Sequence, residues 1–213
     1  MAIQLSPGLS FCRTEDGFVF LDLRSDRYFQ LAPRDHEIFE RLLSGDGERG
    51  EVETFVAAGI LQRAEGAVAC GPAEARVAPD DIYSLEPRRS SLAATLEAGY
   101  HVMRARRAIS AAHLATTIAD LSRRKASASC DLQAILAAAL RFDANRSSIP
   151  IARRCLIDSV ALMRMLLARG LASDLIFGVR TGPFAAHCWL QAGDHVLTCA
   201  QDDARNFTPI LVI

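Results

Sequence analysis

The chain has 213 residues and half of them are hydrophobic, which is enough for one large domain or two small ones. The formal net charge is −1, but residues 1–86 carry 16 Asp and Glu against 8 Arg, whereas residues 87–213 carry 16 Lys and Arg against 9 Asp and Glu. This asymmetry indicates two domains, and the acidic half is unsuited to binding nucleic acid. The sequence has no apolar run of about 18 residues and no signal peptide, so we expect a cytoplasmic protein without a membrane span.

Alternating hydrophobic residues predict strands over residues 9–31, with a β-hairpin formed by residues 17–22 and 27–31. Pro33 then begins a helix that ends at Gly45. A short helix near residues 52–58 and a weak strand to residue 70 follow. This order is typical of a winged helix-turn-helix domain, which we place at residues 1–75.

Winged helices usually bind DNA through a second helix that carries basic or amide side chains. Here the second helix carries Glu51 and Glu53, which would repel phosphates. We therefore expect this domain to bind a peptide and no nucleic acid.

Residues 76–91 contain two prolines and little periodicity, which predicts a linker. Residues 92–141 are rich in Ala and Leu and predict helices with breaks near Ser110 and at residues 127–129. From about residue 175 the pattern predicts strands, at residues 175–180, 185–191, 195–199 and 207–213. The fold class is therefore α+β, with a second domain at residues 92–213.

The six cysteines are scattered and form no C-x-x-C pair, which argues against a disulfide framework and a structural zinc site. We expect no metal and no cofactor. Cys155 differs from the other five because it begins a helix whose apolar residues recur at helical spacing as far as Leu167. The free N–H groups and the positive end of the helix dipole stabilise a thiolate there, which makes Cys155 the candidate nucleophile.

The candidate general base is His187, which lies in an otherwise apolar predicted strand. A cysteine and a histidine on separate elements are the usual arrangement for a cysteine nucleophile and its base. Strand alternation places His187, Trp189 and Gln191 on one face and Cys188 on the other, so Cys188 is not the thiol that His187 activates.

Four motifs now resemble a known family: CLIDSVAL, then RGL followed by DLIFGV, then PFAAHCWLQAGD, and a closing FTPIL. Together they are similar to the lasso peptide B protein, a transglutaminase-like, papain-like cysteine peptidase, over roughly residues 90–213. The N-terminal stretch GFVFLDLRSDRYFQL resembles the PqqD-like leader-recognition domain of ribosomal peptide pathways. The resemblance implies that the N-terminal domain binds the leader of a precursor peptide and that Cys155 and His187 cut leader from core. It also implies a partner, an ATP-dependent cyclase resembling asparagine synthetase.

The family's catalytic Asp lies twelve residues past the His, and this position is Cys199. A three-residue loop at residues 192–194 would set residue 191 opposite 195 and therefore His187 opposite Cys199. A neutral thiol is a weak acceptor for the His187 ring, so the third catalytic residue is either Asp202 or Asp203, with Asp202 as the named candidate, or the enzyme works as a Cys–His dyad. We expect the dyad.

We expect the leader to pair with the edge of the strand at residues 27–31 and to place its side chains against the following helix. The candidate leader-binding residues are Tyr28, Phe29, Gln30, Leu31 and Ile38. Two alternatives to a leader peptidase stay open. One is a non-catalytic chaperone that presents the precursor to the cyclase, and the other is an acyl or peptide transferase on the same fold.

Overall fold

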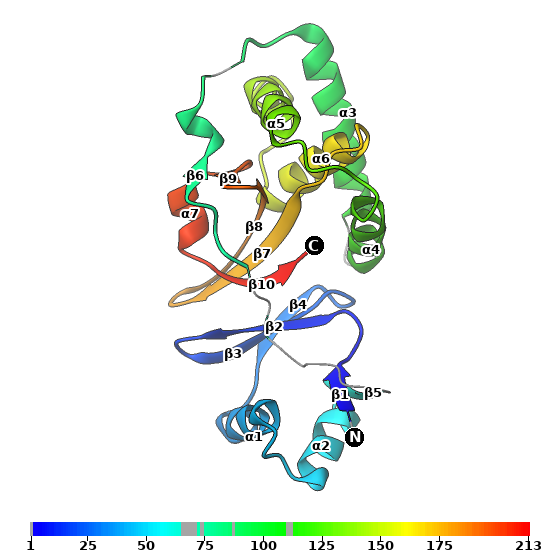
Figure 1. The fold of residues 1–213 in the computed structure, drawn as a ribbon, viewed down its shortest axis with the longest axis vertical. Coiled ribbons are helices and arrows are strands. Elements are labelled where there is room, and N and C mark those ends of the chain that lie inside the picture. The colour runs from blue at the N-terminus through cyan, green and yellow to red at the C-terminus, as the bar shows by residue number, and fades with distance from the viewer. Residues whose placement is uncertain (1, 65–71, 73–74, 87, 110–112) are drawn as a thin grey trace.

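The computed structural model describes residues 2–64, 72, 75–86, 88–109 and 113–213. Figure 1 shows four layers from top to bottom: a group of helices, a five-stranded sheet, a three-stranded sheet and a pair of helices. The N-terminal part of the chain makes the lower two layers, and the C-terminal part makes the upper two. The fold combines helices and strands as the sequence predicts.

The lower sheet is antiparallel and consists of β2 (Leu9–Thr14), β3 (Gly17–Asp22) and β4 (Arg27–Gln30), in that order. Helices α1 (Pro33–Ser44) and α2 (Arg49–Ala57) follow, and β1 (Ala2–Leu5) pairs with β5 (Leu61–Ala64). The predicted hairpin and both predicted helices are confirmed, including the end of α1 at Gly45, whose φ is 85°. Strand β1 had no counterpart in the prediction, and residues 65–70 of the predicted final strand lie outside the described residues.

The two faces of the lower sheet belong to different hydrophobic cores. Three phenylalanines of β2 and β3 point towards α1, where the Phe39 ring lies 5.2–5.3 Å from each of theirs: Phe11, Phe18 and Phe20. Neighbouring residues Cys12, Val19 and Leu21 point the other way and join the core of the C-terminal part. Because β2 also lies against β10 (Thr208–Val212), the two parts of the chain share one continuous core.

The upper sheet has the order β10-β7-β8-β9-β6, with β7 (Asp174–Thr181), β8 (Phe184–Ala192) and β9 (His195–Val196). Its edge strand β6 (Asp80–Asp81) pairs in parallel with β9. This corrects the predicted linker at residues 76–91, because Ala78 and Ile82 are also buried in the C-terminal part. A two-residue strand has no periodicity of its own, so the sequence pattern does not reveal it.

Helices α3 (Leu92–Ala108), α4 (Leu114–Lys125), α5 (Leu132–Arg146) and α6 (Cys155–Leu167) lie in the top layer of Figure 1. The predicted break at residues 127–129 is confirmed. Helix α3 ends at Ala108 and α4 begins at Leu114, on either side of the break predicted near Ser110, which lies outside the described residues. Helix α6 is the central one, since it contacts α3, α4, α5 and β8, and residues 160–163 are fully buried. The short helix α7 (Gln201–Arg205) packs on the opposite face of the sheet, where Ala204 joins a small core with Ile176 and Trp189.

Candidate active site

Cys155 is the first residue of α6, and its side chain is exposed although most of the helix is buried. The preceding residue, Arg154, takes the N-cap position in extended conformation, and no side chain caps the helix. By contrast, Ser91 and Asp131 cap α3 and α5 with side-chain hydrogen bonds. The first N–H groups of α6 are therefore left to a ligand or to water, which is a favourable setting for a thiolate and for a developing oxyanion.

A buried ion pair fixes the chain just before and after Cys155. Arg146, at the end of α5, is 2% exposed, and its Nε donates to Asp158 Oδ1 at 2.7 Å. Its other two nitrogens donate to the carbonyl oxygens of Ile151 at 2.9 Å and Ala152 at 3.2 Å. One guanidinium thus holds both the approach to α6 and the first turn of α6, so it positions Cys155 without touching it.

Ser159 connects α6 to the strand that carries His187. Its hydroxyl donates to the Cys188 carbonyl oxygen at 3.2 Å and lies 3.0 Å from the Thr198 hydroxyl. Residues four apart share one face of a helix, so Ser159 and Cys155 lie on the same face of α6. The face of α6 that carries Cys155 is therefore the face that meets β8 next to His187.

His187 lies in an aromatic stack on the opposite face of β8 from Cys188. Its ring is 5.9 Å from Trp189 and 5.1 Å from Phe207, and the Arg180 guanidinium lies 5.5 Å from the far side of Phe207. The predicted alternation is confirmed, since Trp189 Nε1 also donates to Gln191 Oε1 at 3.4 Å along the same face. Burial lowers the pKa of His187, while the charge of Asp203 raises it, so the ring is biased towards its neutral form.

The space for this stack comes from a glycine that the sequence argument did not single out. Gly178 of β7 lies opposite His187. A Cβ atom at Gly178 would come within 2.7 Å of Trp189 and 2.9 Å of Phe207, closer than real side chains approach. Gly178 is therefore required for the two rings that hold His187, and its signal in the sequence is the G of the DLIFGV motif.

The two candidate aspartates, Asp202 and Asp203, lie on the short helix α7. Both lie exposed in α7, and it is Asp203, not Asp202, whose charge acts on His187. Asp81 of β6 holds this helix in place, because its Oδ2 accepts from the backbone N–H of Gln201 at 2.8 Å. A residue of the predicted linker thus orients the helix that carries the third candidate.

The predicted pairing of His187 with Cys199 is wrong in its register. The loop between β8 and β9 has two residues, so Ala192 faces His195 and Gln191 faces Val196. This shifts every later pair by one residue relative to the prediction. Burial, with the charges of Asp203, Cys155 and Asp81 adding to it, raises the pKa of Cys199 to about 12. Cys199 is therefore a neutral thiol beside the site.

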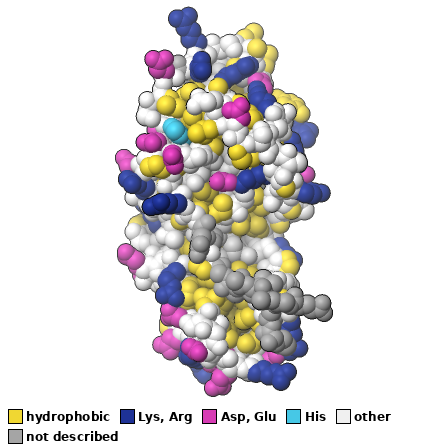
Figure 2. All heavy atoms as spheres, viewed as in Figure 1, with side chains coloured by type: hydrophobic (Ala, Val, Ile, Leu, Met, Phe, Trp, Pro, Cys, Tyr) yellow, Lys and Arg dark blue, Asp and Glu magenta, His cyan; other side chains and the backbone are white. Residues whose placement is uncertain are grey.

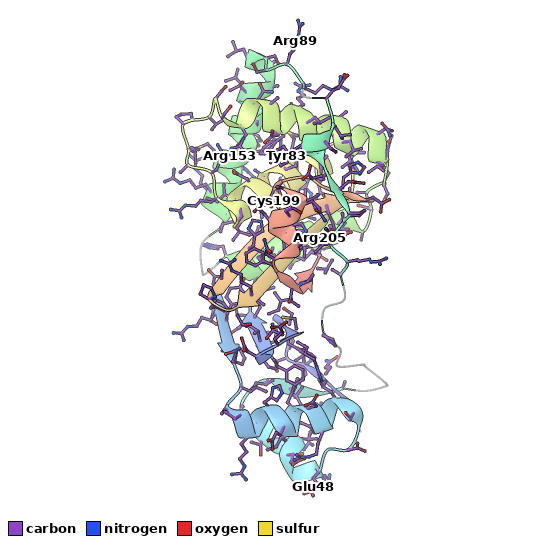
Figure 3. The ribbon with its side chains drawn as sticks, turned by 90° about the vertical axis from the view of Figure 1, so that its left-hand side faces the viewer. Glu48, Tyr83, Arg89, Arg153, Cys199 and Arg205 are labelled. Atoms are coloured by element: carbon purple, nitrogen blue, oxygen red, sulfur yellow. The ribbon has the colours of Figure 1, made fainter. Side chains whose placement is uncertain are left out.

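Several candidate residues of the site act on Cys199. The charges of Asp203 and Cys155 both raise the pKa of its thiol. The phenol of Tyr83 interacts with it as well, and Figure 3 shows Cys199 between Tyr83 above and Arg205 below. Strand β9 pairs with β8 only at Gln191 and Ala192, so the described strands leave the edge of β8 open beside His187. No hydrogen bond joins Cys155 to His187 in the described part of the chain; such catalytic bonds often tighten only when substrate binds.

The candidate leader-binding residues fall on two faces of β4. Phe29, Leu31 and Ile38 are half-buried along the Phe-rich core under α1. Gln30 is exposed. Tyr28 points the opposite way and packs against the Phe184 ring of β8 at 5.6 Å, so it is not a wall of the same groove. Burial raises the pKa of the Tyr28 phenol, and the charge of Cys155 adds a smaller contribution.

Within the described residues, no group of three or more His, Cys, Asp or Glu side chains could hold a metal ion. Across that same part of the chain, no helix is long and apolar enough to cross a membrane. Figure 2 shows Lys and Arg interspersed with Asp and Glu over the upper part of the visible face, not gathered in one basic patch.

Two comparisons with known proteins match part of the chain. The Escherichia coli microcin J25-processing protein McjB is 44% identical over 52 residues, which cover 24% of this chain and 23% of that protein. The matched stretch is thus less than a quarter of the relative's length. No solved structure matches the chain significantly. The sequence profile of the transglutaminase-like superfamily matches residues 90–212. Because this match covers more than half of the chain, the protein belongs to the transglutaminase-like superfamily.

Proposed function

We propose that this protein is the leader peptidase of a lasso peptide pathway, which binds the leader of a precursor and cleaves the leader–core amide bond. The observation that carries the proposal is Cys155, an exposed cysteine at the uncapped start of a buried helix that Ser159 fastens to the strand of His187. A cysteine at a helix start with a histidine on a neighbouring strand supports the roles of nucleophile and base that we propose for them. The partial likeness to a microcin-processing protein supports a peptide precursor as substrate.

The chemistry follows an acyl-enzyme route. The Cys155 thiolate attacks the scissile carbonyl carbon, and the free N–H groups at the start of α6 stabilise the oxyanion. His187 takes the proton of the Cys155 thiol as the attacking thiolate forms, and it gives this proton to the leaving amine as the C–N bond breaks. It then accepts a proton from the water that hydrolyses the thioester and returns it to the Cys155 sulfur as the C–S bond breaks. The lowered pKa of His187 leaves its ring neutral, and so able to accept that proton, near neutral pH.

Leader capture is proposed at the edge of β4. The lower sheet ends at this strand, so its outer backbone groups have no strand partner among the described residues. An extended peptide can add there as a fourth strand and place side chains against Phe29, Leu31 and Ile38. Because Tyr28 of the same strand packs against Phe184 of β8, a peptide bound along β4 lies beside the strand that carries His187. Such tethering raises the local concentration of the scissile bond.

The test is to incubate the purified protein with the precursor encoded beside its gene and to weigh the products. Free leader and free core support the peptidase. An intact precursor that remains bound would instead indicate a chaperone, and a core joined to an added amine would indicate a transferase. The proposed partner cyclase, resembling asparagine synthetase, is left out of the first reaction and added in a second, where a loss of water from the core would report ring closure.

A matched pair of substitutions tests the docking edge. Of the neighbouring residues Phe29 and Gln30, one has its backbone N–H pointing outward from β4. Proline lacks an N–H, so proline at that position removes a hydrogen bond to the leader. We expect one of Phe29→Pro and Gln30→Pro to weaken leader binding about tenfold, measured by fluorescence anisotropy with a labelled leader. Unchanged affinity in both folded variants would place the leader elsewhere.

A further inference from the structure

A cavity of about 670 Å³ opens beside Cys155, and the proposed mechanism makes no use of it. Its volume lies in the range of sites that hold small ligands or several side chains. The lining comes from the end of α3, the segment before α6 and the first turn of α6. The residues that matter here are Arg106, Ile109, Ile151, Arg154, Cys155 and Leu156.

The charged groups of this cavity are all of one sign. Arg106 and Arg154 are exposed, and neither forms an ion pair with any described residue. Neighbouring Arg153, by contrast, pairs with Asp143 at 3.3 Å. No described carboxylate lines the cavity. Two arginines therefore line the space next to the thiol, and neither has a carboxylate partner among the described residues.

The start of α6 adds to this positive character. The helix has 13 residues and no side-chain cap, so its first N–H groups and the positive end of its dipole also face the Cys155 region. The remaining walls are aliphatic, from Ile109, Ile151 and Leu156. Such a combination suits an anion that carries an apolar stem.

The wall is also fixed before any ligand arrives. The buried Arg146 donates to the carbonyl oxygens of Ile151 and Ala152, which both line the cavity. The same guanidinium is paired with Asp158 in the first turn of α6. The distance between the aliphatic wall and Cys155 is thus set by hydrogen bonds within the protein, and the subsite is preformed.

We propose that this cavity is a carboxylate-binding subsite, in which Arg106 and Arg154 select substrates that present an acidic group close to the scissile bond. This inference rests on the proposed function, because it names the chemical group that the proposed peptidase site selects in its substrate. The carboxylate can come from an Asp or Glu side chain or from the C-terminus of the peptide, and both sources offer the same chemistry to the two arginines.

The first experiment probes the cavity without any peptide. Iodoacetate and iodoacetamide both alkylate a thiolate, forming an S–C bond while the C–I bond breaks and iodide leaves. They differ in charge, and because both consume the same thiolate, its ionisation cancels from the ratio of their rates. Peptide mapping by mass spectrometry gives this ratio at Cys155 and at Cys130, an exposed cysteine that serves as the internal reference.

We expect the iodoacetate-to-iodoacetamide ratio at Cys155 to exceed that at Cys130 about tenfold. Arg106→Gln should lower the ratio at Cys155 several-fold. Arg107→Gln is the matched control, because Arg107 is exposed on the next position of α3 but does not line the cavity, and it should leave the ratio unchanged. A ratio that Arg106→Gln does not alter would overturn the subsite.

The second experiment uses the precursor. Each Asp or Glu is changed singly to its amide, and one further peptide is amidated at its C-terminus. We expect one of these changes to lower kcat/KM about tenfold with the wild-type protein and to have little effect with Arg106→Gln. Whether the effective change is a side-chain amide or the C-terminal amide then identifies the source of the carboxylate. Equal kcat/KM for every peptide would contradict the subsite. A precursor that is never cut would instead contradict the proposed function, and the alkylation ratio would then be the test of whether the cavity binds a carboxylate.

Discussion

The two halves of the candidate site are held in different ways. On the Cys155 side, Arg146 makes three hydrogen bonds that fix the chain before and after the nucleophile. On the His187 side, the buried Nε2 atom has no hydrogen-bond partner among the described residues, and the ring is held by stacking on Trp189 and Phe207. The candidate nucleophile is therefore fixed by directional bonds, and the candidate base by packing.

This difference indicates what each half does in a reaction. A nucleophile gains from a fixed position, because small displacements of the attacking atom are costly. A base that must give and receive protons gains from a ring whose nitrogen is not already bonded to the protein. The contrast predicts that substitutions on the Cys155 side act on stability and positioning, and that those on the His187 side act on proton transfer.

The largest expected effect is that of Cys155→Ala. Removing the thiol should abolish cleavage, since no other described cysteine is both exposed and at a helix start. Leader affinity should stay unchanged, because the proposed docking edge is on β4. Product masses and leader anisotropy measure the two properties separately. Cleavage that survives in this variant would contradict the assignment of the nucleophile.

Arg146→Ala tests the Cys155 side of the site, which is held by hydrogen bonds. It leaves Asp158 buried without its partner, which typically costs about 3–5 kcal/mol of the free energy of unfolding. Burial already raises the pKa of Asp158 against the opposing effect of Arg146, so the variant's Asp158 should have a higher pKa still. A folded-state pKa above the unfolded value means that stability falls as pH rises, so the loss should be larger at about pH 8 than at about pH 5.

Urea unfolding measures both effects. The control is Arg123→Ala, which removes an exposed pair with Asp120 and should cost less than about 1 kcal/mol. Similar losses in the two variants would mean that the buried network does not fix the start of α6.

Gly178→Ala tests the His187 side of the site, which is held by packing. The added methyl group would collide with Trp189 and Phe207, and overpacking of this kind costs about 1–3 kcal/mol. Because these rings hold His187, kcat/KM should fall about tenfold or more, while leader affinity should not change. Gly99→Ala is the control, since a Cβ atom there meets open space on helix α3. This variant should leave kcat/KM and leader affinity unchanged, and its stability should be unchanged or improved. Normal cleavage by Gly178→Ala would show that the stack does not position the base.

The smallest expected effect is that of Asp203→Asn. The charge of Asp203 raises the pKa of His187 against the lowering by burial, so its removal should lower that pKa further. If neutral His187 is the base, the acidic limb of the kcat/KM profile should move to lower pH in this variant. Asp202→Asn should leave the limb in place. A hundredfold loss of rate in either variant would instead make that residue a third catalytic member.

The hairpin, the helices and the position of Cys155 at a helix start were predictable, because hydrophobic periodicity and local stop signals encode them. The link between Arg146 and Asp158 was not, since it depends on how the chain turns between α5 and α6. The β8–β9 register and helix α7 were missed for a related reason. A two-residue loop and a three-residue loop differ by one position, and five helical residues carry too little periodicity to be recognised.

The face of the lower sheet formed by Cys12, Val19 and Leu21 has a consequence for how such a protein could be divided. If residues 1–64 and 76–213 were made as separate chains, each would expose an apolar surface that the other covers in the single chain. The two fragments should therefore reassociate without a covalent connection, at an affinity set by that surface and by their concentrations. Fusion in one chain replaces this bimolecular step by an intramolecular one, so the proposed leader-binding part and the thiol remain together even when the protein is dilute.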